Sequence, residues 1–263
     1  MPEPTALKRR IAAGETALGI SFTLGNAHAV ELCAHSSLDY VYFDQQHGLT
    51  SLDTLINQLR AIAGSPVTPL VRVLRNDPGL IGQVLDVGAE GVIVPMVNSA
   101  EDARLAVAGC RYPPDGVRSW GPIRARFGLG SDPEEVNSRV LCFVMIETRD
   151  AVENVEEIVA VPGVDGVYLG PADLGVSMGL KPKVGLQDGE HAQAIKRVVT
   201  ACRAAQRVAA ISGRPREMSG LGFGMVSVGS DTGFIQAGLD QAGELRQELA
   251  RSLPAAMSSF PPS

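Results

Sequence analysis

The sequence has little of what a disulfide-bonded or zinc-binding protein needs. It contains 4 cysteines among 263 residues, without a Cys-x-x-Cys pair or a His/Cys cluster at zinc spacing. Cys142 lies in an apolar run and Cys202 in a helical pattern. We therefore expect buried free thiols in a reducing cytoplasm, and neither a disulfide scaffold nor a zinc site.

The sequence also lacks an excess of positive charge and a long apolar run. Lys and Arg number 23 against 29 Asp and Glu, a net charge of −6, so there is no dominant basic face for nucleic acid or an acidic membrane. The polar start of the chain is followed by no apolar run long enough for a signal peptide or a membrane span. A hydrophobic content of 45% is ordinary for a globular protein with a full core. These absences predict a cytoplasmic protein that binds neither nucleic acid nor a membrane.

Short β-type runs alternate with helical patterns along the chain. Strands are expected near residues 17–22, 40–43, 68–72, 91–94, 141–146, 166–169, 208–211 and 225–228. Helical patterns cover residues 27–35, 51–63, 78–87, 99–108, 151–160, 190–206, 214–221 and 232–251. This alternation is typical of βα units and a parallel sheet, and eight units predict a closed (β/α)₈ TIM barrel in a single domain. We expect that domain to span residues 1–253, before a flexible tail at 254–263. A miscount of one strand would give an open sheet instead.

One long connection, residues 111–131, precedes the fifth expected strand. It carries Trp120 and, after Arg111 at its start, the arginines Arg118, Arg124 and Arg126. Loops of this length are usually functional or disordered. We expect an active-site or interface loop.

Two acids follow neighbouring strands of the expected barrel. Glu147 directly follows the fifth strand, and Asp173 follows the sixth after Gly170-Pro171-Ala172. The carboxyl ends of parallel strands meet in one crevice, so the two carboxylates would lie close together. They would repel unless a proton or a hard cation such as Mg²⁺ or Mn²⁺ sat between them. The alternative is that both acids are only caps or first-turn acids of the helices that follow.

A histidine and an arginine occupy the same rim. His47 follows the second strand and can move a proton near neutral pH. Arg72 ends the third strand and offers a planar fork of donors that suits a carboxylate or developing negative charge. Either residue could instead be structural. The Gly170-Pro171-Ala172 turn could aim backbone N–H groups at an anion, which is a weak signal alone.

This set of residues predicts metal-dependent aldol chemistry. A divalent cation held by two carboxylates would chelate a 2-oxoacid and polarise its carbonyl, so the C3 carbanion would form as a metal-bound enolate. Arg72 would add positive charge beside the enolate, and His47 would shuttle the proton of the 4-hydroxyl group. No lysine lies at an expected strand end, which disfavours a Schiff base. Mg²⁺, Mn²⁺ and Co²⁺ all suit an all-oxygen site.

At these residues the chain resembles the HpcH/HpaI aldolase family, the class II, metal-dependent pyruvate aldolases such as 4-hydroxy-2-oxoheptanedioate aldolase. The resemblance rests on the segments 43–48 (Phe-Asp-Gln-Gln-His-Gly), 84–89, 94–97, 111–118, 145–147 (Met-Ile-Glu) and 169–174 (Leu-Gly-Pro-Ala-Asp-Leu).

The resemblance implies a role for each site residue. It implies Glu147 and Asp173 as metal ligands, Arg72 at the substrate carbonyl, and His47 as the acid/base residue supported by Asp86. The turn formed by Gly170, Pro171, Ala172 and Asp173 would bind the substrate carboxylate through backbone amides. It also implies a barrel whose last helix, at residues 232–251, exchanges between subunits of a hexamer built from dimers.

Two departures from the family pattern affect specificity. The chain has Gln46 before His47 where the family often has an acid, and a neutral neighbour should make the histidine less basic. Ser21 stands where well-known members carry a tryptophan, which suggests a roomier pocket and leaves the aldehyde open.

The predicted function is therefore reversible cleavage of a 4-hydroxy-2-oxoacid to pyruvate, or a related 2-oxoacid, and an aldehyde. One alternative is a CoA-ester lyase of the malyl-CoA or citryl-CoA type, for which Arg118, Arg124 and Arg126 could line a nucleotide groove. Another is a non-catalytic barrel that binds 2-oxoacids, suggested by Gln46 and Ser21.

Overall fold

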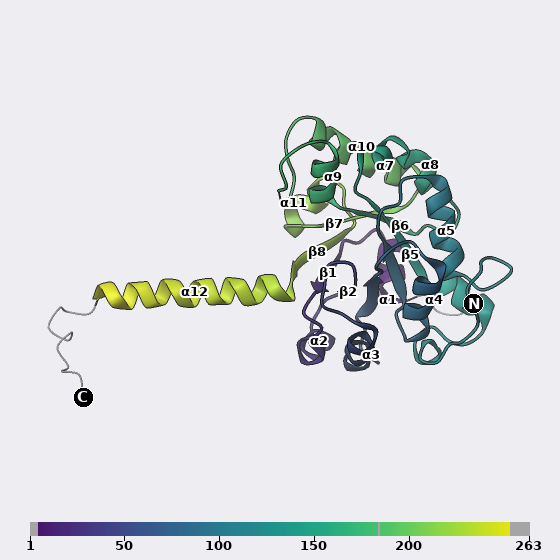
Figure 1. Ribbon diagram of the computed structural model, residues 1–263, viewed down its shortest axis with the longest axis horizontal. Helices are drawn as coiled ribbons and strands as arrows, with labels where there is room; N and C mark the ends of the chain where they lie inside the picture. The colour runs from purple at the N-terminus through teal and green to yellow at the C-terminus, as the bar shows by residue number, and fades with distance from the viewer. Residues whose placement is uncertain (1–4, 184, 253–263) are drawn as a thin grey trace.

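A computed structural model describes residues 5–183 and 185–252. Its strands form a closed parallel barrel in sequence order, in which β8 also pairs with β1 (Figure 1). The strands are β1 (Ala17–Phe22), β2 (Tyr40–Asp44), β3 (Thr68–Arg72), β4 (Gly91–Val94), β5 (Leu141–Ile146), β6 (Gly166–Leu169), β7 (Val208–Ser212) and β8 (Met225–Ser230). The predicted (β/α)₈ TIM barrel is confirmed and the open sheet is excluded.

Helices surround the barrel on its outer side, except the first, which covers its amino end, and the last, which extends away from it (Figure 1). They are α1 (Ala6–Ala12), α2 (Ala27–Ala34), α3 (Leu52–Ala61), α4 (Pro78–Asp86), α5 (Ala100–Cys110), the 3₁₀ turn η1 (Ala125–Phe127), α6 (Pro133–Arg139), α7 (Arg149–Glu153), α8 (Val155–Val159), α9 (Pro171–Ser177), α10 (Glu190–Ala204), α11 (Pro215–Gly220) and α12 (Asp231–Ser252). Side chains cap several starts; Ser51, for example, accepts a hydrogen bond from the Thr54 amide. Of the helices that the sequence did not predict, α9 matters most, because it begins inside the Gly170–Asp173 motif.

The barrel interior is filled and closed at its amino end. Alternate strand residues such as Leu70, Phe143 and Met145 pack inside it. Leu7 of α1 is buried below them, and its backbone amide donates to Thr68 Oγ1 at 3.2 Å. Among the described residues, α1 thus covers the amino end of the barrel, and the carboxyl ends of the strands form the opposite end, called the mouth below. Cys142 and Cys202 are buried free thiols, as predicted.

Hydroxyl groups connect the interior below this mouth. Tyr168 Oη lies 2.8 Å from Ser227 Oγ and 2.9 Å from Ser212 Oγ. Tyr40 Oη lies 2.8 Å from the same Ser227 oxygen. Burial raises the pKa of both Tyr40 and Tyr168, so both phenols stay protonated at neutral pH. Uncharged hydroxyl groups that are hydrogen-bonded to one another therefore lie directly below the mouth of the barrel.

The connection at residues 111–131 lies at the opposite end of the barrel from this mouth. The Arg124 amide donates to the Asp86 carbonyl oxygen, and Arg124 Nε donates to that of Val87. These carbonyls end α4, which runs back from the mouth toward the amino end of β4. These residues therefore do not form a loop at the mouth of their own barrel, and the expectation of an active-site loop is wrong in this respect. Trp120 and Phe127 are largely exposed, so an interface role stays a prediction.

Helix α12 extends away from the barrel (Figure 1). Residues 232–251 are all exposed, including Ile235, Leu239 and Leu245. Within residues 5–183 and 185–252, no helix is long and apolar enough to cross a membrane. The predicted tail, 254–263, lies outside the described residues, and the cytoplasmic location stays a prediction.

Candidate active site

Glu147 is held in place by the backbone of a neighbouring loop. Its side chain is 2% exposed, and Oε1 accepts a hydrogen bond of 2.7 Å from the Met96 amide. Met96 has φ 56°, a left-handed conformation that is unusual outside glycine and that occurs at functional sites. The following helix is capped by Thr148, which accepts from the Ala151 amide at 3.1 Å. Glu147 is therefore not the cap of α7, and its carboxylate is directed elsewhere.

Asp173 is brought to Glu147 by the first turn of α9. An added Cβ at Gly170, the residue before this helix, would lie only 2.8 Å from both Cβ and Oε2 of Glu147, so the close approach of the two segments requires a glycine. Burial raises the pKa of Glu147, and the negative charge of Asp173 raises it further, whereas Arg72 and His47 lower it. The two carboxylates therefore repel each other at the mouth of the barrel.

This carboxylate pair suits a hard cation. Neither Glu147 nor Asp173 forms an ion pair with a basic side chain in the described parts of the chain. No third His, Cys, Asp or Glu among those residues joins them as a ligand group. Carboxylate oxygens are the ligands that Mg²⁺ and Mn²⁺ prefer, and both ions keep several waters. The two residues thus fit a divalent ion whose remaining ligands would be water or substrate oxygens.

Arg72 is fixed by Asp44, a residue that our sequence analysis did not assign to the site. Arg72 Nε donates to Asp44 Oδ1 at 2.9 Å and Nη2 to Oδ2 at 2.5 Å. Burial alone would lower the pKa of Arg72, but its hydrogen bonds to Asp44 and the electrostatic effects of Asp44, Tyr42 and Tyr168 together raise it, so it stays charged. Nη1 lies 4.0 Å from Met145 Sδ on β5, so the guanidinium reaches across the mouth. The sequence shows that Asp44 follows the second expected strand and that Arg72 ends the third, but only the structure shows the register that pairs them.

His47 lies in the bend that follows β2. Its backbone amide donates to Asp44 Oδ1 at 3.2 Å, so Asp44 orients both this bend and Arg72. At Gly48 an added Cβ would overlap the Asp44 carbonyl oxygen, so the sharp turn requires glycine. The His47 side chain is exposed and has no hydrogen-bond partner among residues 5–183 and 185–252. Its ring is thus accessible to a ligand.

Asp86 is not brought to His47 within one chain. It is the last residue of α4, and its Oδ1 lies 2.6 Å from Arg118 Nη2. Burial raises the pKa of Asp86, and Arg118 lowers it. Support of His47 by Asp86 would therefore have to come from another copy of the chain, and it stays a prediction.

The three arginines that would form a nucleotide groove do not line this mouth. Arg118 has a fully buried side chain paired with Asp86. Arg124 binds a carbonyl at the end of α4, and Arg126 lies over the ring of Phe127 at 5.2 Å. The CoA-ester lyase alternative loses the feature that suggested it.

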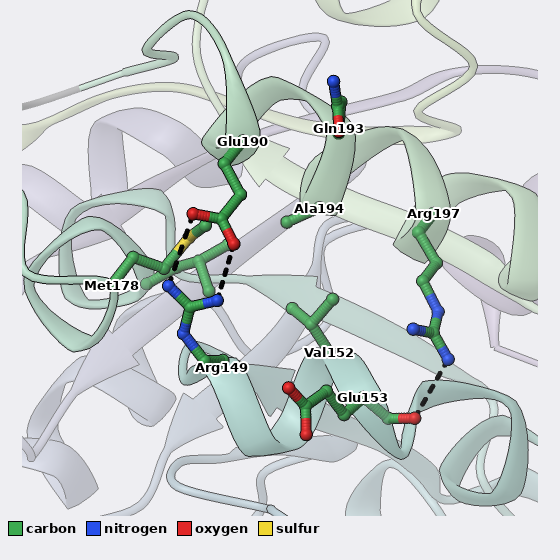
Figure 2. Close-up of a pocket in the computed structure, with 9 residues that line it drawn as sticks. Arg149, Val152, Glu153, Met178, Glu190, Gln193, Ala194 and Arg197 are labelled. Atoms are coloured by element: carbon green, nitrogen blue, oxygen red, sulfur yellow. Dashed lines mark hydrogen bonds and ion pairs between the residues drawn. The ribbon is translucent and has the colours of Figure 1, made fainter.

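A separate surface pocket of about 230 Å³ lies among α7, α9 and α10 (Figure 2). Its walls include Val152, Leu174 and Met178, with Arg149 and Glu190 at its edge. None of the residues predicted for the site lines it. It lies behind the helices that follow the two carboxylates and is not the mouth of the barrel.

Known proteins resemble this sequence along most of its length. The sequence matches the family HpcH/HpaI aldolase/citrate lyase over residues 19–237. It is 36% identical to a 4-hydroxy-2-oxo-heptane-1,7-dioate aldolase of Salmonella dublin, over 89% of this chain and 92% of that protein.

Solved structures agree with the sequence match. An HpcH/HpaI aldolase/citrate lyase family protein of Burkholderia cenocepacia J2315 superposes with a TM-score of 0.85 at 31% identity, over 92% of this chain and 99% of the other. An HpcH/HpaI aldolase of Desulfitobacterium hafniense DCB-2 gives a TM-score of 0.81 at 26% identity, over 98% and 100% of the two chains. This chain therefore belongs to the HpcH/HpaI aldolase/citrate lyase family.

Proposed function

We propose that this carbon–carbon lyase is a class II aldolase that reversibly cleaves a 4-hydroxy-2-oxoacid to pyruvate, or a related 2-oxoacid, and an aldehyde. One observation carries the proposal. Glu147 and Asp173 form a carboxylate pair without a basic partner in the described residues, beside the charged Arg72. The name of the Salmonella dublin relative makes 4-hydroxy-2-oxoheptanedioate the first substrate to test.

The residues around the carboxylates divide the work of the reaction. A divalent ion such as Mg²⁺, Mn²⁺ or Co²⁺, held by Glu147 and Asp173, would supply the Lewis acidity that polarises the 2-oxo group. Arg72 donates hydrogen bonds where negative charge develops on that oxygen, and Asp44 keeps its guanidinium aimed. The Gly170-Pro171 turn directs the amides of Ala172 and Asp173 toward the substrate carboxylate.

His47 removes the proton of the 4-hydroxyl group during cleavage. We expect His47→Ala to reduce cleavage by about 100-fold, the lower end of the range for a lost general base. Exchange of the pyruvate C3 protons with deuterium should fall much less, because that step does not involve the hydroxyl group. Proton NMR of pyruvate in D₂O measures exchange, and pyruvate release measures cleavage.

His28→Ala is the control for this experiment, because the side chain of His28 is 95% exposed on α2. It should leave both rates unchanged. Equal losses of cleavage and exchange in His47→Ala would remove the assigned role.

The protein works as a homo-oligomer in this proposal. Helix α12 exposes Ile235, Leu239 and Leu245 along its length, and apolar surface of this extent marks a contact site. A second copy that exchanges this helix would cover it, and a hexamer built from dimers is the expected assembly. A monomeric mass in light scattering at micromolar concentration would contradict this.

Pyruvate release tests the function itself. Purified protein with Mg²⁺, Mn²⁺ or Co²⁺ should release pyruvate from 4-hydroxy-2-oxoacids, measured by coupling to lactate dehydrogenase, and EDTA should stop the reaction. No release from any such acid would favour the non-catalytic 2-oxoacid-binding barrel. Activity that survives EDTA and is trapped by borohydride would indicate a Schiff base instead.

A further inference from the structure

A histidine that the proposed reaction does not use is fully buried beside the site. His191 lies in the first turn of α10 and has 0% exposure. Its Nδ1 accepts a hydrogen bond of 3.2 Å from the Gln187 amide, and its Nε2 lies 2.9 Å from the Pro171 carbonyl oxygen. An amide only donates and a carbonyl only accepts, so the ring carries its single proton on Nε2. Both ring nitrogens are thereby satisfied in the neutral form.

The acceptor of this bond belongs to the segment that carries Asp173. Pro171 is the first residue of α9, and Asp173 follows two positions later. Helix α9 has only 7 residues, and no side chain caps its start at Gly170. An added Cβ at Gly175 would lie 2.8 Å from Gln187 Nε2 and 3.8 Å from His191 Nε2, so α9 packs directly on this group. The orientation of its first turn depends on such outside contacts.

The same turn of α10 also contacts the segment after Glu147. Figure 2 shows Glu190, the neighbour of His191, paired with Arg149 at the start of α7, and Oε1 lies 2.6 Å from Nη1. This ion pair is exposed and contributes little energy. The buried hydrogen bond of His191 contributes more, because losing its partner would leave a polar group without water.

We propose that His191 is a positioning residue: its Nε2–H bond to Pro171 fixes the first turn of α9 and thereby the carboxylate of Asp173 against Glu147. The inference rests on the proposed cation site but not on the aldolase reaction. Removing a hydrogen bond that orients a metal ligand typically lowers metal affinity about 10- to 100-fold. His191 is thus expected to set cation affinity without touching the cation or the substrate.

Two amide substitutions separate the bonds of the imidazole ring. In His191→Gln the side-chain NH₂ reaches the position of Nε2 and keeps the donor to Pro171. In His191→Asn the shorter side chain reaches only the position of Nδ1 and keeps the bond with Gln187. We expect Mn²⁺ affinity, measured by titration of the full-length protein, to fall about 10-fold in His191→Asn and to stay within about twofold of wild type in His191→Gln. Thermal unfolding identifies any variant that is not folded.

Each outcome decides the inference. Wild-type affinity in both variants, or equal losses in both, would overturn it, because the Pro171 bond would then not be responsible. If His191→Asn does not fold, the wild-type protein serves instead: with only 4 histidines in the chain, ¹⁵N-histidine labelling isolates the Nε2–H signal of His191. Mg²⁺ should shift that signal, and an unmoved signal at saturating Mg²⁺ overturns the inference. If the wild-type protein binds no Mn²⁺, the cation site itself is refuted. If it turns over substrate but the two His191 variants do not differ in Mn²⁺ affinity, only this inference is refuted.

Discussion

Glu147→Gln should lower divalent-cation affinity at least ~100-fold and abolish most pyruvate release, because losing a ligand costs more than losing an outer-shell hydrogen bond. Glutamine keeps the shape of the side chain and an oxygen acceptor for the Met96 amide. The variant therefore tests the negative charge rather than the packing. Calorimetric titration with Mn²⁺ and the pyruvate assay measure the two effects. Wild-type cation affinity would contradict the assignment, and Glu157→Gln, an exposed acid on α8, should behave as wild type.

The same variant should change the stability of the metal-free protein in a defined direction. Burial and the charge of Asp173 raise the pKa of Glu147, so the folded chain binds this proton more tightly than the unfolded chain does. The stability that Glu147 contributes therefore falls as the pH rises through the ordinary glutamate pKa and up to the raised value. With EDTA at pH 7, Glu147→Gln should unfold at the same temperature as wild type or higher, and the difference should shrink as the pH approaches 4. If Glu147→Gln unfolded at a lower temperature than wild type at pH 7 but not near pH 4, the charge of Glu147 would stabilise the metal-free fold, contrary to this prediction.

Arg72→Lys should reduce kcat by about 100- to 1,000-fold, the usual loss when a preorganised donor to developing negative charge is removed. Lysine keeps the positive charge but cannot form the two-point pairing that joins Arg72 to Asp44. Cation affinity should change by less than about threefold, since Arg72 is not a ligand. Steady-state pyruvate kinetics and Mn²⁺ titration separate the two quantities.

A matched arginine and the partner acid complete the Arg72 experiment. Arg75→Lys alters an arginine that is 68% exposed in the loop after the same strand, and it should leave kcat unchanged. Asp44→Asn should also reduce kcat, as Arg72→Lys does, because Asp44 acts by orienting the Arg72 guanidinium. An unchanged kcat in Arg72→Lys would show that charge alone suffices and would remove the proposed geometry.

The sequence by itself determined the barrel and the rim residues. Short, continuous apolar runs mark these strands, because the strands of a parallel barrel are buried on both faces. Eight such runs separated by helices have one simple closed arrangement. Glu147, Arg72 and His47 could be placed on one rim without coordinates, because parallel strands all end at the same side of the barrel. For this reason the prediction extended to the site as well as to the fold.

Partners across the chain required the tertiary structure. Asp44 joins Arg72 to the His47 bend, and the left-handed Met96 turns its amide toward Glu147; both depend on loop conformations that periodicity does not record. The expected pairing of Asp86 with His47 is replaced within the chain by Arg118, because α4 carries Asp86 to the far end of the barrel.

The connection at residues 111–131 was misplaced for a different reason. Its length and composition indicate importance, but the order of the predicted elements already placed it after a helix, and a helix that follows a parallel strand returns the chain to the amino end of the barrel. His191 gave no signal in the sequence beyond one polar residue on a buried helical face, and its bond to Pro171 joins residues 20 positions apart. Local patterns record which face of an element is buried, whereas the contact that a buried polar group makes is set by the packing of the whole chain.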